Sequence, residues 1–350
     1  MHKYFAVFYL IFRASEARLP DLKLLSIGDL DLRYSFILGV FYITIFMMDL
    51  LREISLKFWL SLFLIYIGIT VLFNTRVMSL LPLYSQLLID VFIGLIFIRK
   101  IGNLHLVLKL VYVLGTMTMV LNYVFLEQID FLETLRNHNT GAVRVFGLFG
   151  DSFPFFLVLL GINFFKENKY WFFIAVSISF FIESFGATAL GLVYLMFSYL
   201  QIRSSNRLGS FIFLNITYIL ILELFAGLYY GSKSHSLSLR LDTIEFALRQ
   251  LDFNNLLYAG YGMFSFIEKP LGIFGNVTNQ FVQWIFELGL LGLILALLVF
   301  SEALNKGSRR MSSWVFLGLL TFTWFLPGYF IITLIMLIYE KKSCSFHNDN

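Results

Sequence analysis

The chain has 350 residues, of which 59% are hydrophobic and only 14% are charged, and its formal net charge at pH 7 is +4. Soluble globular domains carry about 25% charged residues, so this composition excludes an ordinary water-soluble fold and predicts that most of the surface faces lipid. The basic residues are scattered in short segments between apolar runs, which membrane orientation explains, so nucleic acid is not an expected partner.

The apolar runs predict an all-α, polytopic membrane bundle of about twelve transmembrane helices in a single domain, 1–350. A spanning helix needs about 20 apolar residues. The first run is followed by Arg13, Glu16 and Arg18 rather than by a small-residue cleavage site, so we expect a retained span and not a cleaved signal peptide. The candidate spans are 3–19, 34–51, 57–73, 77–98, 104–126, 152–165, 170–183, 186–202, 208–229, 281–301 and 313–339, the last broken by Pro327-Gly328 and expected to cross twice.

Positive charge predicts that both termini are cytoplasmic. Cytoplasmic loops are enriched in Lys and Arg. If the spans alternate from a cytoplasmic N-terminus, the inner segments hold Lys3, Arg52, Lys57, Arg99, Lys100, Lys166, Lys169, Arg203, Arg207, Lys306, Arg309, Arg310, Lys341 and Lys342. Two long outer loops remain, 127–150 and 230–280, and we expect outer-face chemistry to come mainly from them.

Charged residues also lie within the predicted spans. Asp90 and Lys109 fall at comparable depths on adjacent antiparallel spans, and we expect a structural ion pair between them, with a functional role as the alternative. Glu183 and Glu223 fall near the outer ends of their spans, where they could line an outward-facing cavity or lie at the interface.

Residues 237–257 of the larger loop predict an amphipathic helix that lies on the membrane surface or caps the bundle. Glu245 precedes Arg249 by four residues, the favourable order for a local ion pair. Arg240 has no acid on its side of the helix and is a candidate for binding an anionic lipid phosphate, with interfacial snorkelling as the alternative. The expected apolar stripe comprises Leu237, Leu241, Ile244, Leu248 and Leu251.

The smaller loop offers a second arginine of this kind. Arg144 has no acidic neighbour before Asp151, whereas Arg136 follows Asp130 and Glu133 and is expected to pair with them. The five histidines have no zinc-ligand spacing, the single cysteine cannot form an intrachain disulfide, and no P-loop, G-x-S-x-G or D-x-D motif is present. We therefore expect neither a metal nor another cofactor.

Three passages within about 140–300 resemble the bacterial O-antigen polymerase and O-antigen ligase superfamily. Arg144-Val-Phe-Gly147, running to Asp151, is similar to the outer-loop R-x-x-G of that family. Arg240 followed by Gly260-Tyr-Gly262-Met-Phe264 is similar to its large-loop R…G-x-G-x-F signature. Asn279 followed by Glu287-Leu-Gly289-Leu-Leu-Gly292 is similar to its H-N…E-x-G-x-x-G passage, with Thr278 in place of the histidine.

The resemblance implies a metal-independent glycosyltransferase in the bacterial inner membrane, acting at the periplasmic face on undecaprenyl-diphosphate-linked glycans during lipopolysaccharide biosynthesis. Thr278 favours the polymerase over the ligase. Arg144 and Arg240 would stabilise the charge on the departing diphosphate. The candidate bases are the carboxylates near the outer face, Glu183, Glu223, Glu268 and Glu287, with Glu183 and Glu223 taken as the catalytic candidates. The expected substrate-binding residues are Arg136, Arg249, Asp151, Gly260, Gly262, Asn279 and Glu287.

The expected partners are the lipid-linked glycan, membrane lipid, a chain-length regulator and a flippase. The main alternative from another class is a transporter such as that flippase, although the internal repeats that many transporters show are not apparent. A non-catalytic scaffold of a glycan export complex is a further alternative.

Overall fold

The computed structural model describes the ranges 2–15, 23–27, 30–46, 58–101, 242–251, 259–270 and 280–306, and single helical residues at 106, 107, 110, 111, 113, 114, 117, 173, 174, 176, 177, 180, 188, 192, 217, 220 and 224. These parts of the chain are helical apart from one two-stranded hairpin, so the predicted helical class is confirmed for them with that exception. The expected count of twelve spans and the loop 127–150 lie outside the described residues.

Five α-helices and one 3-10 helix are described in full: α1 (His2–Ser15), α2 (Tyr34–Ile45), α4 (Phe58–Leu72), α5 (Val77–Lys100), η2 (Met263–Phe266) and α13 (Gln280–Lys306). Two of them are long and apolar enough to cross a membrane, over Val77–Phe97 and Val282–Val299. These stretches coincide with the predicted spans 77–98 and 281–301. Helices α2 and α4 are equally apolar but shorter than a full span.

A β-hairpin occupies the segment between α1 and α2, which the apolar pattern predicts only as a connection. Strands β1 (Lys23–Ile27) and β2 (Leu30–Arg33) pair in antiparallel register, with Ile27 opposite Leu30. Only Gly28 and Asp29 separate the strands, and a Gly-Asp pair between short runs is a known hairpin signal. The all-α prediction is therefore wrong for this segment.

Aromatic side chains pack α1 and α2 against α5. The rings of Phe5 and Tyr42 stack with their centroids 3.8 Å apart, and both contact Phe97 edge-on. Gly39 of α2 faces Ile89 so closely that a Cβ atom would clash with the isoleucine side chain. The absence of a side chain at Gly39 thus sets the distance between α2 and α5.

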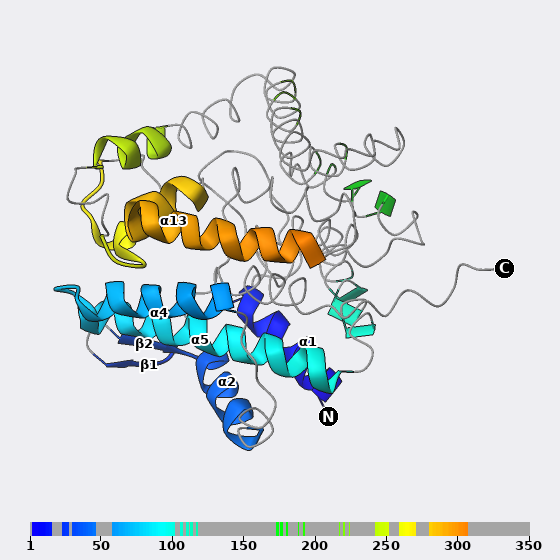
Figure 1. Ribbon diagram of the computed structural model, residues 1–350. Helices are drawn as coiled ribbons and strands as arrows, with labels where there is room; N and C mark the ends of the chain where they lie inside the picture. The colour runs from blue at the N-terminus through cyan, green and yellow to red at the C-terminus, as the bar shows by residue number, and fades with distance from the viewer. Residues whose placement is uncertain are drawn as a thin grey trace, which may run out of the picture.

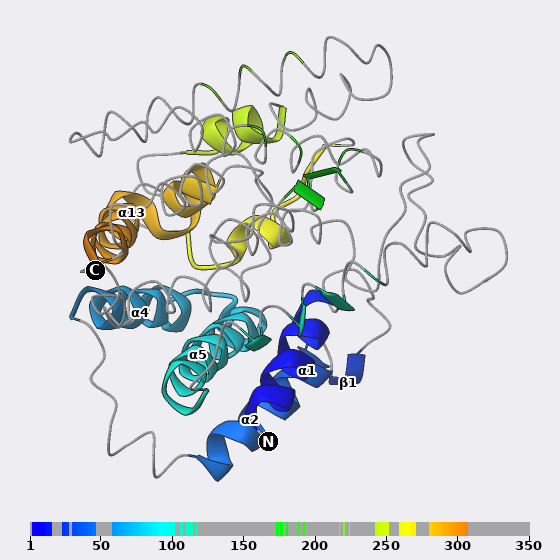
Figure 2. The same ribbon diagram turned by 90° about the vertical axis from the view of Figure 1, so that its right-hand side faces the viewer.

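Helices α4 and α5 run in opposite directions, so the chain turns back between them at one end of the molecule (Figures 1 and 2). In Figure 1 the N-terminus and the carboxyl ends of α5 and α13 lie on the right, whereas the α4–α5 turn and the segment 259–270 lie on the left. Asn74 of that turn donates a hydrogen bond from Nδ2 to the Ala259 carbonyl oxygen at 2.6 Å. Alternation of the predicted spans places these two connections on the same side, and they are in contact.

Candidate functional site

Helix α13 is broken at Gly289, inside the predicted span. Gly289 has φ 67° and ψ −172°, a conformation that glycine adopts readily and other residues avoid. Figures 1 and 2 show two helical segments that meet at a bend. In a continuous helix the carbonyls of Glu287 and Leu288 would accept hydrogen bonds from amides four residues later, and the break turns these two oxygens away from that ladder.

Groups from distant parts of the chain bind the two freed carbonyls. The Glu287 carbonyl accepts hydrogen bonds from the backbone amides of Gly260, at 2.7 Å, and Ala259, at 3.2 Å. The Leu288 carbonyl accepts one from the Tyr66 hydroxyl at 2.7 Å. Buried backbone groups are costly when they lack partners, so these bonds allow α13 to bend within an apolar environment.

The segment 259–264 also encloses the Glu287 side chain, which is 1% exposed. Its Oε1 accepts hydrogen bonds from the Gln283 side chain at 3.1 Å and from the Phe264 amide at 3.4 Å, and the Gly262 amide donates to the same carboxyl group. Glu287 therefore holds the segment 259–264 through both its backbone and its side chain. We call this unit the Glu287 junction.

Two positions of the Glu287 junction require glycine. Gly260 has φ 109° and Gly262 has φ 84°, both in the left-handed region. A Cβ atom would lie 2.5 Å from Asn74 Nδ2 at the first position and 2.6 Å from Leu83 Cδ1 at the second. The G-x-G spacing thus serves both the turn and its close approach to α4 and α5.

The described part of the amphipathic helix, 242–249, packs against the junction, and Ile244 of the predicted apolar stripe lies against the buried cluster, as does Leu251 just beyond the helix. Ala247 is fully buried and clusters with Phe264 and Phe286, whose rings lie 5.5 Å apart. Leu248, expected on the buried stripe, is 46% exposed. The prediction is wrong for Leu248, because the small Ala247 occupies the buried position beside the Phe264 ring.

Arg249 forms its predicted ion pair with Glu245. Both side chains are more than half exposed, so the pair contributes only a few tenths of a kcal/mol, about 0.3–0.5. Arg249 therefore lies on the solvent side of its helix, away from the buried face that contacts Phe264.

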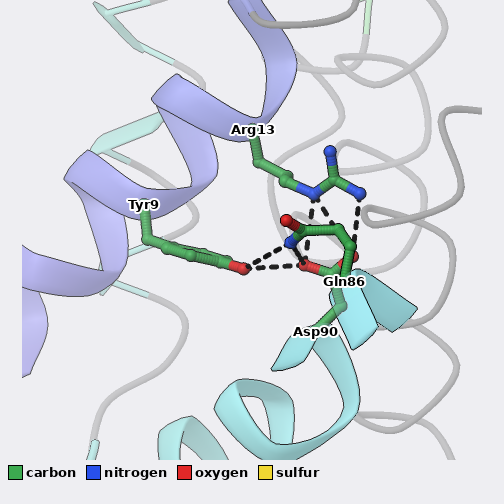
Figure 3. Close-up of polar contacts among 4 residues, drawn as sticks. All are labelled: Tyr9, Arg13, Gln86 and Asp90. Carbon is green, nitrogen blue, oxygen red and sulfur yellow. Dashed lines mark hydrogen bonds and ion pairs between the residues drawn. The ribbon is translucent and has the colours of Figure 1, made fainter. Parts of the chain in front are cut away.

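A second polar cluster is buried between α1 and α5 (Figure 3). The Arg13 guanidinium donates from Nε to both Asp90 carboxylate oxygens at 3.2 Å and from Nη2 to Oδ2 at 2.9 Å. The Tyr9 hydroxyl donates to Asp90 Oδ1 at 2.7 Å, and Gln86 Nε2 donates to the same oxygen at 3.2 Å. Charged, bidentate hydrogen bonds of this kind are among the strongest in proteins.

This cluster gives Asp90 a partner that the sequence does not predict. The ion pair joins Asp90 to Arg13, 77 residues away, whereas the predicted partner Lys109 lies outside the described residues. Asp90 is 1% exposed and Arg13 is 8% exposed. A charged residue within an apolar run indicates a buried pair of this kind. Arg13 is such a residue, because it lies within the predicted span 3–19.

Tyr261 belongs to the segment 259–264 of the Glu287 junction. It sits between Gly260 and Gly262, and burial raises the pKa of the Tyr261 hydroxyl. The negative charges of Glu287 and Asp90 raise this pKa further, while Arg13 acts in the opposite direction. The phenol therefore stays protonated at neutral pH and senses the charges of both sites.

The structure brings together three of the predicted site residues, Gly260, Gly262 and Glu287, and places Arg249 apart from them. Asn74, Tyr66 and Gln283 complete the junction, and no local sequence pattern identifies them. The remaining predicted residues lie outside the described ranges: Arg144, Arg240, Glu183, Glu223, Arg136, Asp151 and Asn279.

Comparison of the chain with protein-family models, with curated proteins and with solved structures finds no match. The resemblance to the O-antigen polymerase and ligase superfamily therefore rests on the sequence passages themselves. Two of those passages, 260–264 and 287–292, can be located in the structure.

We expect Glu287→Ala to destabilise the protein more than Glu287→Gln. Each buried amide left without an acceptor lowers the stability by about 1–3 kcal/mol. The alanine variant removes the acceptor of the Gly262 and Phe264 amides. Glutamine keeps one oxygen acceptor in place. Thermal unfolding of the purified protein in detergent measures the difference, and equal losses in the two variants would show that hydrogen-bond acceptance is not what Glu287 provides.

Proposed function

We propose that this chain is an O-antigen polymerase, a glycosyltransferase that joins undecaprenyl-diphosphate-linked repeat units at the periplasmic face of the inner membrane. The observation that carries the proposal is the Glu287 junction. The passages G-x-G-x-F and E-x-G-x-x-G are separated along the chain, yet Gly260, Gly262 and Phe264 all contact the helix segment that begins the second passage. Residues chosen for their resemblance to one family thus form one packed unit.

The proposed orientation places both termini in the cytoplasm. The two candidate spans support a membrane location, and the charges support the orientation. Lys3, Arg99, Lys100 and Lys306 belong to the ends of α1, α5 and α13 that lie together, opposite the segment 259–270 (Figure 1). An end rich in cations is expected to face the cytoplasm.

In the proposed reaction, a hydroxyl of the incoming lipid-linked unit attacks the anomeric carbon of the growing glycan. The bond from that carbon to the undecaprenyl diphosphate breaks, and the diphosphate leaves with the bonding electrons. Arg144 and Arg240 stabilise the charge that develops, typically a few kcal/mol for each well-placed donor, about 3–4. A carboxylate at the outer face, Glu183 or Glu223, accepts the hydroxyl proton.

Within this proposal Gly260, Gly262 and Glu287 position the large loop and do not touch the substrate. Their polar groups are engaged with one another, as the contacts of the Glu287 junction require. The loop that carries Arg240 is thereby fastened to α13 at one end. Fixed geometry matters because an electrostatic catalyst must be organised before charge develops.

The broken helix α13 is the observation that favours a transporter as the second candidate. Many transporters bind ions or substrates at the exposed backbone of interrupted helices. In this chain the carbonyls at the break already accept hydrogen bonds from Gly260, Ala259 and Tyr66. Because these oxygens already accept hydrogen bonds, they are not available to bind an ion. The break therefore favours a role in anchoring the loop over a role as an ion site.

Deletion of the gene and inspection of surface glycans by gel electrophoresis tests the proposal. A polymerase deletion is expected to leave a single repeat unit on each lipid A core. Bare core with retained lipid-linked polymer would identify a ligase instead, and repeat units left untransported would identify a flippase. Unchanged long glycan ladders would rule out all three roles.

A further inference from the structure

Two basic residues contact the same short stretch, 264–267, at the end of the molecule where the α4–α5 turn contacts the segment 259–270. Arg76 precedes α5; its Nη1 donates to the Phe266 carbonyl at 3.1 Å, and its guanidinium lies 5.9 Å from the centre of the Phe266 ring. Lys269 donates from Nζ to the Ile267 carbonyl at 3.3 Å and lies 4.9 Å from the centre of the Phe264 ring. Both cations are thus attached to the short stretch 264–269.

Neither cation contacts a carboxylate within the described part of the chain. Arg13 and Arg249, by contrast, are each paired with an acid. A guanidinium has five donors and an ammonium three, so one carbonyl contact leaves most of the hydrogen-bonding capacity of Arg76 and Lys269 unused. Partial burial lowers the pKa of Lys269 because it disfavours the charged form, and a bound anion would relieve that cost.

The surroundings are those of a membrane boundary. Leu72, Phe73 and Met78 flank the turn and are 63%, 76% and 73% exposed. The same turn joins the apolar helix α4 to the candidate span in α5. Charged groups beside exposed apolar side chains at the end of a spanning helix lie at the level of lipid phosphates.

The aromatic contacts hold the two cations without neutralising them. A ring face attracts a cation by about 0.5–1 kcal/mol at exposed sites, which orients the side chain but supplies no counter-charge. A phosphate would supply both the charge and the acceptor oxygens, and arginine binds it through parallel hydrogen bonds.

We propose that Arg76 and Lys269 form a binding site for a lipid phosphate, supplied either by a phospholipid headgroup or by a polyprenyl diphosphate. This proposal rests on the proposed function in one respect only, which is that polyprenyl diphosphate is named as a source of the phosphate. It lies on the α4–α5 turn and the stretch 264–269, and it uses neither of the two arginines assigned to the proposed reaction.

The test uses the full-length protein in phosphatidylcholine nanodiscs, with radiolabelled undecaprenyl diphosphate as the probe. We expect Arg76→Gln with Lys269→Gln to weaken binding about tenfold or more, because charge-assisted hydrogen bonds are lost. The matched control, Lys3→Gln with Lys100→Gln, removes the same charge from exposed positions. Lys100 ends the helix that begins beside Arg76, about 36 Å away, and this control should bind like the wild type. Arg76→Lys with Lys269→Arg keeps both charges and should bind more tightly than the glutamine variant.

Competition with unlabelled phosphatidylglycerol distinguishes the two sources. If phosphatidylglycerol displaces the probe from the wild type but not from the glutamine variant, the site binds phospholipid headgroups. If phosphatidylglycerol does not displace the probe from the wild type, the site binds the diphosphate. Both outcomes support a phosphate site. Equal binding by the glutamine variant and the charge-matched control would overturn the proposal. If the double variant does not elute as a folded protein, the single variant Lys269→Gln carries the same comparison. The binding measurement does not depend on polymer synthesis. An unchanged surface glycan in the deletion strain would therefore contradict the proposed function without contradicting this binding site.

Discussion

Asp90→Ala is expected to lower the free energy of unfolding by about 3–5 kcal/mol, since it removes the carboxylate that binds the buried Arg13 guanidinium. Arg13 is 8% exposed and donates to both oxygens of the missing carboxylate. Water cannot easily replace that carboxylate between α1 and α5. The loss is measured as a lower unfolding temperature for the purified protein in detergent.

A double-mutant cycle separates the charge from the packing. Arg13→Met alone and Asp90→Leu alone should each be about as harmful as Asp90→Ala, whereas Arg13→Met combined with Asp90→Leu should recover much of the stability, because apolar replacements of a buried ion pair are often tolerated. Tyr9 and Gln86 keep a hydrogen bond to each other, at 3.3 Å, in the double variant. A double variant that loses the sum of the two single losses would mean that the residues act independently.

The sequence predicts features that depend on nearby residues and misses those that depend on distant ones. The pair of Arg249 with Glu245 follows from a spacing of four residues on one helix, and it is present. The partner of Asp90 is 77 residues away on α1, and no local spacing favours Arg13 over Lys109. Hydropathy identifies the span in α5 but not what its charged residue binds.

The break in α13 illustrates a second limit. Mean hydropathy treats 281–301 as one continuous run, and a glycine within an apolar run does not by itself reveal a positive φ angle. The break is stable because Gly260, Ala259 and Tyr66 bind the freed carbonyls. Those partners lie at least 27 residues away along the chain, so only the folded structure reveals the bend.

The buried face of the helix at 242–249 follows from shape and not from hydrophobicity alone. Leu248 is the more apolar side chain, yet Ala247 takes the buried position beside Phe264. A pattern of large apolar residues assumes a flat surface opposite the helix. Where the opposite surface is an aromatic ring that projects toward the helix, a small side chain packs better.

Arg240→Ala and Arg144→Ala are each expected to abolish polymer growth while leaving the protein in the membrane. Both residues belong to the predicted outer segments and lie outside the described ranges, and neither has an acidic sequence neighbour expected to neutralise it. Removing a donor that stabilises charge on a leaving group typically lowers the rate about 100- to 1000-fold, which is enough to eliminate long chains from a gel of surface glycans. Lysine at either position should restore little, because it cannot form the two parallel hydrogen bonds that arginine makes to a phosphate.

Arg249→Ala is the matched control, since it removes the same side chain from an exposed ion pair with Glu245 on the same loop. We expect it to leave polymer growth much less affected than Arg240→Ala. Immunoblots of membrane fractions establish that all three variants are present at similar levels. Long glycan ladders in cells that carry Arg240→Ala or Arg144→Ala would mean that the diphosphate charge is stabilised elsewhere. Among the described cations Arg76 and Lys269 would then be the groups to test, because they are the pair that meets the segment 259–270 without an acid.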